Sequence, residues 1–147
     1  MPAQIIIVDD DPLVGGLTLE LLTDAGYAAR LIQDSLKAQD IIKAEKPALV
    51  VLDILMPGLD GLTILHRLKS DPETEPIRAI IVSGKSFEAE KQRAAQYGAE
   101  AFIEKPYDVE LFAQRVHEIM KKQGVEPRKI ARAPSEPAPT PRTEIKA

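Results

Sequence analysis

The sequence predicts an α/β fold in which one parallel sheet is covered by helices on both faces. Five short apolar runs alternate with five amphipathic or Ala-rich stretches, the connections between them are short, and three of the five runs are continuously apolar. Continuous apolar runs are typical of strands buried on both faces, as in parallel sheets. The alternation therefore predicts a doubly wound (βα)5 sheet with right-handed crossovers.

The predicted strands are short runs in which Ile, Val, Leu and Ala predominate. They are residues 5–8, 27–32, 49–52, 77–82 and 101–103. The second run is the least apolar of the five, which favours a place at the edge of the sheet.

The first helix is predicted to begin at Asp11 and Pro12, because an acid can cap a helix and Pro is favoured at its first position. Gly26 can end it. Its apolar positions recur at helical intervals, at Leu13, Val14, Leu17 and Leu21.

The remaining helices are predicted from start and stop signals. They run from near Ser35 to before Pro47, over about residues 61–70, over about residues 86–97 up to Gly98, and from Asp108 to Gly124. The third and fifth carry the clearest inward-facing positions, which are Leu62, Leu65 and Leu68, and Phe112, Val116 and Ile119.

Composition limits the classes of function. Of the 147 residues, 44% are apolar, which is enough for the core of one domain. The chain has no Cys, which excludes disulfides and thiolate metal sites and favours a reducing cytoplasm. The only apolar run near the N-terminus is followed at once by three acids, so we expect neither a signal peptide nor a membrane span.

The charge is unevenly distributed. The net charge is −4, but the residues from Gln123 onward contribute +2, so the body carries about −6. An acidic body argues against direct DNA binding. After Gly124 the pattern dissolves, and five of the twelve prolines fall between Pro127 and Pro141. We therefore expect a folded domain over residues 1–123 and a flexible Pro/Ala-rich tail or linker over residues 124–147.

Polar residues follow four of the five predicted strands. They are Asp9, Asp10 and Asp11 after the first, Asp53 after the third, Ser83 after the fourth and Lys105 after the fifth. The carboxyl ends of parallel strands share one edge of the sheet, where ligands bind in open α/β folds. We therefore expect these side chains to converge, except that of Asp11, which we expect to cap the helix that begins at Pro12.

Crowded carboxylates require compensation. Two of them about 4 Å apart repel each other by roughly 4 kcal/mol at an effective dielectric constant near 20. One lysine cannot neutralise three acids, whereas a hard divalent cation with oxygen ligands can. The strand-end pattern thus favours a Mg²⁺ site.

Four motifs resemble those of response-regulator receiver domains in two-component signalling. They are Ile-Ile-Val-Asp9-Asp10, then Asp53-Ile-Leu-Met-Pro57 with Gly61 eight residues after Asp53, Val-Ser83-Gly84, and Lys105-Pro106. The resemblance covers roughly residues 3–122. It implies the flavodoxin-like strand order 2-1-3-4-5 and a Lys105–Pro106 peptide that is cis in many relatives.

The resemblance also implies a role for each site residue. Asp53 would accept a phosphoryl group from a sensor histidine kinase or a histidine phosphotransfer protein. Mg²⁺, which Mn²⁺ can replace, would be held by Asp9, Asp10, Asp53 and the main-chain carbonyl of Leu55. Lys105 and Ser83 would contact the phosphoryl oxygens, and Ser83 with Phe102 would form the switch.

Other expectations concern residues beside the site. Leu55 and Lys85 stand where, by the same resemblance, relatives vary to tune water attack on the acyl phosphate, and neither offers an amide or carboxylate to orient a water. We therefore hypothesise that the phospho-form loses its phosphate more slowly than fast chemotaxis-type receivers do. His66 and His117 are expected at the surface, and Phe87, Tyr97 and Tyr107 are expected to serve in packing.

The sequence leaves three alternative functions open. Asp9-x-Asp11 resembles the opening motif of haloacid-dehalogenase-like phosphatases, although Pro12 interrupts that motif and the chain is short for such an enzyme. A flavodoxin-like cofactor module would need a phosphate cradle where three acids stand. An unphosphorylated interaction module would keep the same fold.

Output is expected to pass through protein contacts. The resemblance implies a contact face formed by the fourth helix, the fifth strand and the fifth helix, in a monomer or a phosphorylation-dependent dimer, with an unknown downstream protein as target. We expect a stand-alone receiver that is no enzyme beyond promoting its own phosphorylation and dephosphorylation. A piece of a longer regulator remains the alternative.

Overall fold

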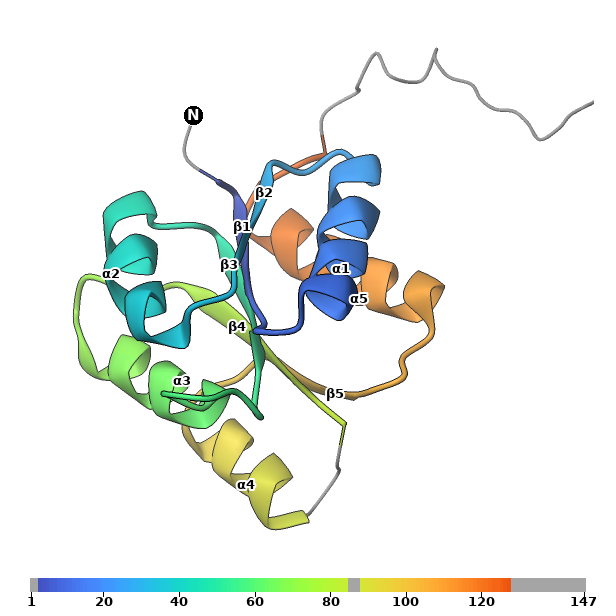
Figure 1. Ribbon diagram of the computed structural model, residues 1–147. Helices are drawn as coiled ribbons and strands as arrows, with labels where there is room; N and C mark the ends of the chain where they lie inside the picture. Colours follow the sequence, from blue (N-terminus) through green and yellow to red (C-terminus); the bar gives the residue numbers. More distant parts are fainter. Residues whose placement is uncertain (1–2, 85–87, 128–147) are drawn as a thin grey trace, which may run out of the picture.

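A computed structural model describes residues 3–84 and 88–127 of the chain. Helices and strands alternate along it (Figure 1). The strands are β1 (Ile5–Val8), β2 (Ala29–Ile32), β3 (Leu49–Asp53), β4 (Arg78–Ser83) and β5 (Ala101–Glu104). The helices are α1 (Pro12–Asp24), α2 (Ser35–Glu45), α3 (Gly61–Ser70), α4 (Glu88–Gln96) and α5 (Val109–Lys122).

The five strands form one parallel sheet in the order β2-β1-β3-β4-β5, which confirms the predicted fold and places β2 at an edge. In the register, Val8 of β1 pairs with Leu52 of β3. Asp9 and Asp53, each one residue further on, are therefore neighbours at the carboxyl edge of the sheet.

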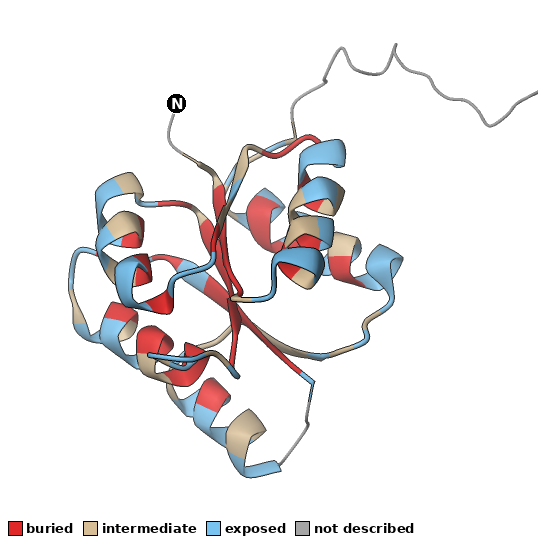
Figure 2. Cartoon of the chain, viewed as in Figure 1, coloured by how far each residue is buried: buried red, intermediate tan, exposed pale blue. Residues whose placement is uncertain are grey.

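Helices cover both faces, with α1 and α5 on one side and α2, α3 and α4 on the other (Figure 1). The central strands β1, β3 and β4 are almost wholly buried, as Figure 2 shows. Each face of the sheet forms its own apolar cluster with the helices that cover it. Among the described residues, no helix is long and apolar enough to cross a membrane.

Acidic caps fix the starts of four helices, which include the predicted cap Asp11 and also Asp108, where the fifth helix was predicted to begin. The side chain of Asp11 accepts hydrogen bonds from the amides of Leu13 and Val14, at 2.9 and 3.3 Å. The other two caps are Asp34 and Asp60. Because a cap pairs amides that have no partner inside the helix, these acids determine where each helix begins.

The predicted element boundaries differ from the structure at a few places. β2 begins at Ala29 rather than at Tyr27, whose side chain packs in the core instead. The predicted start of α4 falls on residues 85–87, which lie outside the described residues, as does most of the predicted tail.

The largest difference between the predicted and the observed fold is the face of α1 that is buried. Leu13 and Leu17 are 70% and 59% exposed, and the buried positions are Gly15, Thr18 and Leu22. Helical spacing alone could not distinguish these two faces, because a small residue allows closer approach to the sheet than a leucine does. A Cβ at Gly15 would lie 2.8 Å from the Leu31 side chain and 3.3 Å from Cβ of Asp9.

Candidate functional site: an acidic cluster at the carboxyl edge of the sheet

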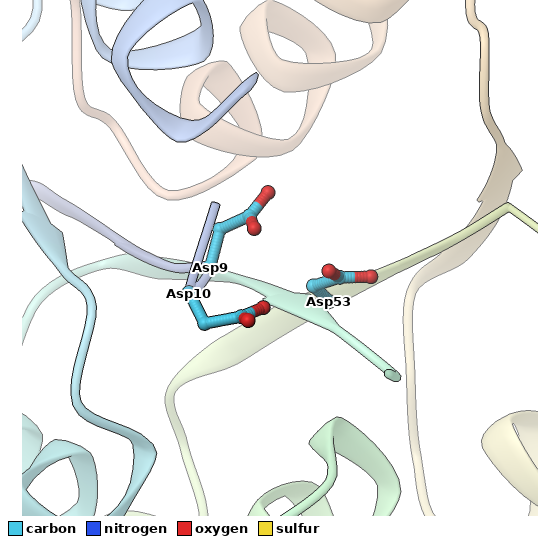
Figure 3. Close-up of side chains that lie close together, drawn as sticks. All are labelled: Asp9, Asp10 and Asp53. Carbon is cyan, nitrogen blue, oxygen red and sulfur yellow. The ribbon is translucent and has the colours of Figure 1, made fainter. Parts of the chain in front are cut away.

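Three carboxylates from two strand ends meet at one edge of the sheet (Figure 3). Asp9 and Asp10 follow β1, and Asp53 ends β3. Each offers a carboxylate oxygen that lies within 4.8 Å of those of the other two. Asp9 and Asp53 are 4% and 8% exposed, so much of the cluster is withdrawn from water.

Lys105 brings a positive charge to the cluster from the end of β5. Its Nζ lies 3.2 Å from Oδ2 of Asp9 and 3.3 Å from Oδ2 of Asp53. The other oxygen of Asp9, Oδ1, accepts a hydrogen bond from the amide of Asp11 at 2.9 Å. Asp9 is thus held on both sides, and Lys105 bridges the first and third strands.

The pKa values of Asp53 and Lys105 reflect this arrangement. Burial raises the pKa of Asp53, the Lys105 ammonium opposes the rise, and the carboxylates of Asp9 and Asp10 add to it, so that the net shift is upward. Burial lowers the pKa of Lys105, but the carboxylates of Asp53 and Asp9 outweigh burial, so that the pKa is raised. Lys105 is therefore firmly cationic, whereas the ionised form of Asp53 is incompletely compensated.

The residues present fit a hard divalent cation. Carboxylate oxygens are the ligands that Mg²⁺ prefers, and one ammonium leaves the three acids with an excess of negative charge. Asp11 does not join the cluster, because its side chain caps α1 as expected. Leu55, two residues after Asp53, has a side chain that is 55% exposed.

Ser83 lies beside the acids at the end of β4. In the register, Asp53 pairs with Val82, so Ser83 stands one residue beyond Asp53 along the neighbouring strand. Ser83 is 1% exposed, and its carbonyl accepts a hydrogen bond from the amide of Lys105 at 2.7 Å. A Cβ placed on Gly84 would meet no atom within 4 Å, so the space beside Ser83 is open.

Phe102 lies three residues before Lys105, partly buried against the cluster on the α2, α3 and α4 side. The Lys91 ammonium stands 6.0 Å from the centre of its ring. His66 and His117 are at the surface as expected. Lys85 and Phe87 lie outside the described residues.

Two hydrogen bonds of Ser35, which the sequence did not predict, hold the loop between β3 and α3. The buried hydroxyl of Ser35 donates to the carbonyl of Pro57 at 2.7 Å and accepts from the amide of Leu59 at 3.0 Å. At the other end, Gly61 approaches β3 so closely that a Cβ there would lie 2.3 Å from the carbonyl oxygen of Asp53.

Tyr107 was expected to serve in packing, and its ring does stack on Phe112. Its hydroxyl also contacts that of Thr18 at 2.6 Å, joining the segment after Lys105 to α1. Nothing in a single sequence pairs two residues 89 positions apart. The Lys105–Pro106 peptide is cis, as the resemblance implied.

Comparison with known proteins agrees with the fold. Residues 5–117 match the family described as the response regulator receiver domain. The response regulator MprA of Mycolicibacterium vanbaalenii is 32% identical over 122 residues, which are 83% of this chain and 52% of MprA. The polar-differentiation response regulator DivK of Brucella anthropi is 32% identical over 116 residues, which are 79% of this chain and 94% of DivK.

A solved structure agrees as well. The signal receiver domain of a DNA-binding response regulator (merR) from Colwellia psychrerythraea superimposes with a TM-score of 0.75 at 28% identity, over 80% of this chain and 97% of that one. A parallel sheet of this order, with acids and a lysine at its carboxyl edge, defines a class of signalling module. The chain belongs to the response regulator receiver domains of two-component systems.

Proposed function

We propose that this chain is a phosphorylation-activated switch that accepts a phosphoryl group on Asp53 from a sensor histidine kinase or a histidine phosphotransfer protein. The observation that carries the proposal is the contact of Lys105 with Asp53 and Asp9, inside a cluster of three acids from two strand ends. This arrangement supplies a nucleophile and a cation at one place, and phosphoryl transfer depends mainly on positioning and charge neutralisation.

Each residue has a distinct role in the proposal. Asp9, Asp10, Asp53 and the main-chain carbonyl of Leu55 would hold Mg²⁺, and Mn²⁺ could take its place. The ion, when bound, neutralises negative charge on the transferred group. A carboxylate oxygen of Asp53 forms a bond to phosphorus while the P–N bond of the phosphohistidine breaks and the imidazole nitrogen keeps the electron pair.

Lys105 and Ser83 act on the group once it is attached. The ammonium of Lys105 pairs with a phosphoryl oxygen, and the Ser83 hydroxyl donates a hydrogen bond to another. Because Ser83 and Phe102 lie on neighbouring strands, movement of Ser83 toward the phosphoryl group frees space into which Phe102 turns. The signal is then read by a protein that contacts the face formed by α4, β5 and α5.

The remaining elements of the proposal concern the whole protein. The chain spans about half the length of MprA but nearly all of DivK. We propose a cytoplasmic receiver over residues 1–123, with residues 124–147 as a tail or linker, that acts as a monomer or a phosphorylation-dependent dimer. Its acidic body does not contact DNA, and it catalyses only its own phosphorylation and dephosphorylation.

Intact-mass spectrometry after incubation with acetyl phosphate and Mg²⁺ tests the proposal. We expect one added phosphate on the wild-type chain, none on Asp53→Asn, and none on the wild type when EDTA removes the metal. A wild-type chain that stays unlabelled at saturating donor and metal would contradict the proposal and favour an unphosphorylated interaction module.

A further inference from the structure

The segment that follows β5 has to place the ammonium of Lys105 accurately. A lysine side chain has a flexible four-carbon stem, so the position of its charge depends on how well the backbone beneath it is fixed. On the N-terminal side, the amide of Lys105 donates to the carbonyl of Ser83 at 2.7 Å. On the C-terminal side, Tyr107 is the next side chain after Pro106.

Tyr107 is anchored to two helices. Its ring stacks on that of Phe112 in α5, with the ring centres 4.6 Å apart and the planes 23° from parallel, and Phe112 is 1% exposed. Its hydroxyl meets the hydroxyl of Thr18 in α1 at 2.6 Å. Tyr107 therefore ties the segment after Lys105 to both helices on this face of the sheet.

The direction of the Thr18–Tyr107 hydrogen bond follows from the rest of the network. Thr18 is 4% exposed, and its Oγ1 donates to the carbonyl of Val14 at 3.1 Å. A threonine hydroxyl has a single hydrogen, so Oγ1 acts as the acceptor toward Tyr107. The Tyr107 hydroxyl donates, and removing it leaves the hydrogen bond from Thr18 to Val14 intact.

The pair lies directly behind the acidic cluster. A small cavity of about 10 Å³ is lined by Thr18 and Tyr107 together with Asp9, Asp53 and Lys105. A cavity of this size holds at most about one water molecule, so Thr18 and Tyr107 pack closely beside the acids and Lys105.

We propose that Thr18 and Tyr107 are positioning residues, whose hydrogen bond holds Lys105 in the place from which it pairs with a phosphoryl group on Asp53. The inference rests on the proposed function. Small displacements of a group that contacts the reacting atoms reduce rates substantially. One net hydrogen bond of ordinary strength corresponds to roughly a threefold to tenfold effect on rate.

The first test compares two tyrosines that each lose one hydroxyl. Tyr107→Phe keeps the ring that stacks on Phe112, and Tyr27→Phe is the control, because the Tyr27 hydroxyl bonds His117 at 2.9 Å, away from the acids. We expect the initial rate of labelling by acetyl phosphate to fall threefold to tenfold in Tyr107→Phe and to stay at the wild-type value in Tyr27→Phe.

Variants at Thr18 and a metal titration separate positioning from a merely structural role. Thr18→Ser keeps an acceptor hydroxyl and should label at nearly the wild-type rate, whereas Thr18→Val should match Tyr107→Phe. The dissociation constant for Mg²⁺, measured by calorimetry, should be unchanged in all of them. A loosened fold would weaken metal binding as well.

A double-mutant cycle with Lys105→Ala decides whether the pair acts through Lys105. Labelling in the Lys105→Ala background is followed for hours by mass spectrometry, and we expect Tyr107→Phe to slow it no further. An equal slowing in both backgrounds, or equal rates for Tyr107→Phe and Tyr27→Phe, would overturn the inference. Absence of labelling in the wild type would instead overturn the proposed function.

Discussion

The surroundings of Asp53 disfavour its ionised form. Burial and the neighbouring carboxylates of Asp9 and Asp10 together outweigh the Lys105 ammonium, so the pKa of Asp53 is raised in the folded protein. An acid whose folded pKa is raised contributes stability where it is protonated, and that contribution is lost as pH rises through the folded pKa. Metal-free protein therefore loses this contribution as pH rises through that range.

Asp53→Asn should consequently be more stable than the wild type at neutral pH in EDTA, because the amide has nearly the same shape and no charge. Urea unfolding at several pH values measures this. The difference in unfolding free energy should shrink as pH falls toward the range where Asp53 itself becomes protonated. An Asn variant that is less stable than the wild type at neutral pH would contradict the electrostatic account.

Asp10 and Asp11 are neighbours in the sequence, but their side chains make different contacts. Asp10 belongs to the acidic cluster, whereas the side chain of Asp11 caps α1. We expect Asp10→Asn to weaken Mg²⁺ binding by roughly tenfold or more, since affinity follows the charge of the ligand set. Calorimetric titration measures the affinity.

Asp11→Ala is the matched control. It keeps the backbone amide that donates to Asp9 but removes the cap, so it should leave Mg²⁺ affinity nearly unchanged and lower stability by about 1 kcal/mol. If the Asp11 variant lost metal affinity to the same extent as the Asp10 variant, the assignment of ligand and cap would be wrong.

At the scale of the element, the start of α3 sits against the end of β3. A Cβ on Gly61 would lie 2.3 Å from the carbonyl oxygen of Asp53 and 2.9 Å from its carbonyl carbon, and backbone atoms cannot yield as a flexible side chain can. We expect Gly61→Ala to lower the free energy of unfolding by about 1–3 kcal/mol, as overpacking does, and to slow labelling of Asp53.

Gly16→Ala is the matched control for that substitution. A Cβ at Gly16, within α1, would meet nothing within 4 Å, so alanine there should stabilise the protein by about 0.5–1 kcal/mol. Urea unfolding of both variants measures the two effects. Equal and small effects would show that α3 can move away from β3 without loss.

The sequence predicts the elements of this fold better than the faces they bury. Apolar runs located the strands to within two residues, because burial on both faces leaves a continuous signal. In α1, Leu13 and Leu17 are exposed, and Gly15, Thr18 and Leu22 are the buried positions. Small and polar residues that bury by close approach or hydrogen bonding carry no hydropathy signal.

The candidate site divides in the same way. Asp9, Asp10, Asp53, Ser83 and Lys105 could be predicted because strand ends of a parallel sheet share one edge. The residues that hold these side chains and their loops in place could not be predicted. Ser35 forms hydrogen bonds with a loop more than twenty residues away in the sequence. Four strands of the sheet lie between Thr18 and Tyr107 along the chain.

At the scale of the whole molecule, the contacts of the folded domain extend past the end of α5. The amide of Gly124 bonds the carbonyl of Lys121, the amide of Val125 bonds that of Met120, and Val125 packs against the apolar cluster of α1 and α5. We therefore expect a chain that ends at residue 127 to unfold at the same temperature as the full chain and to label at the same rate. Calorimetry and mass spectrometry measure both, and a lower unfolding temperature for the shortened chain would contradict this boundary.

We propose that the acid at the end of β3 is the one that becomes phosphorylated. Borohydride reduces an aspartyl phosphate to homoserine, which marks the site permanently, and peptide sequencing by mass spectrometry then locates it. After labelling with acetyl phosphate and Mg²⁺, we predict homoserine at position 53 and unmodified aspartate at positions 9, 10 and 11. Homoserine at any of those three positions, with position 53 unchanged, would contradict the account.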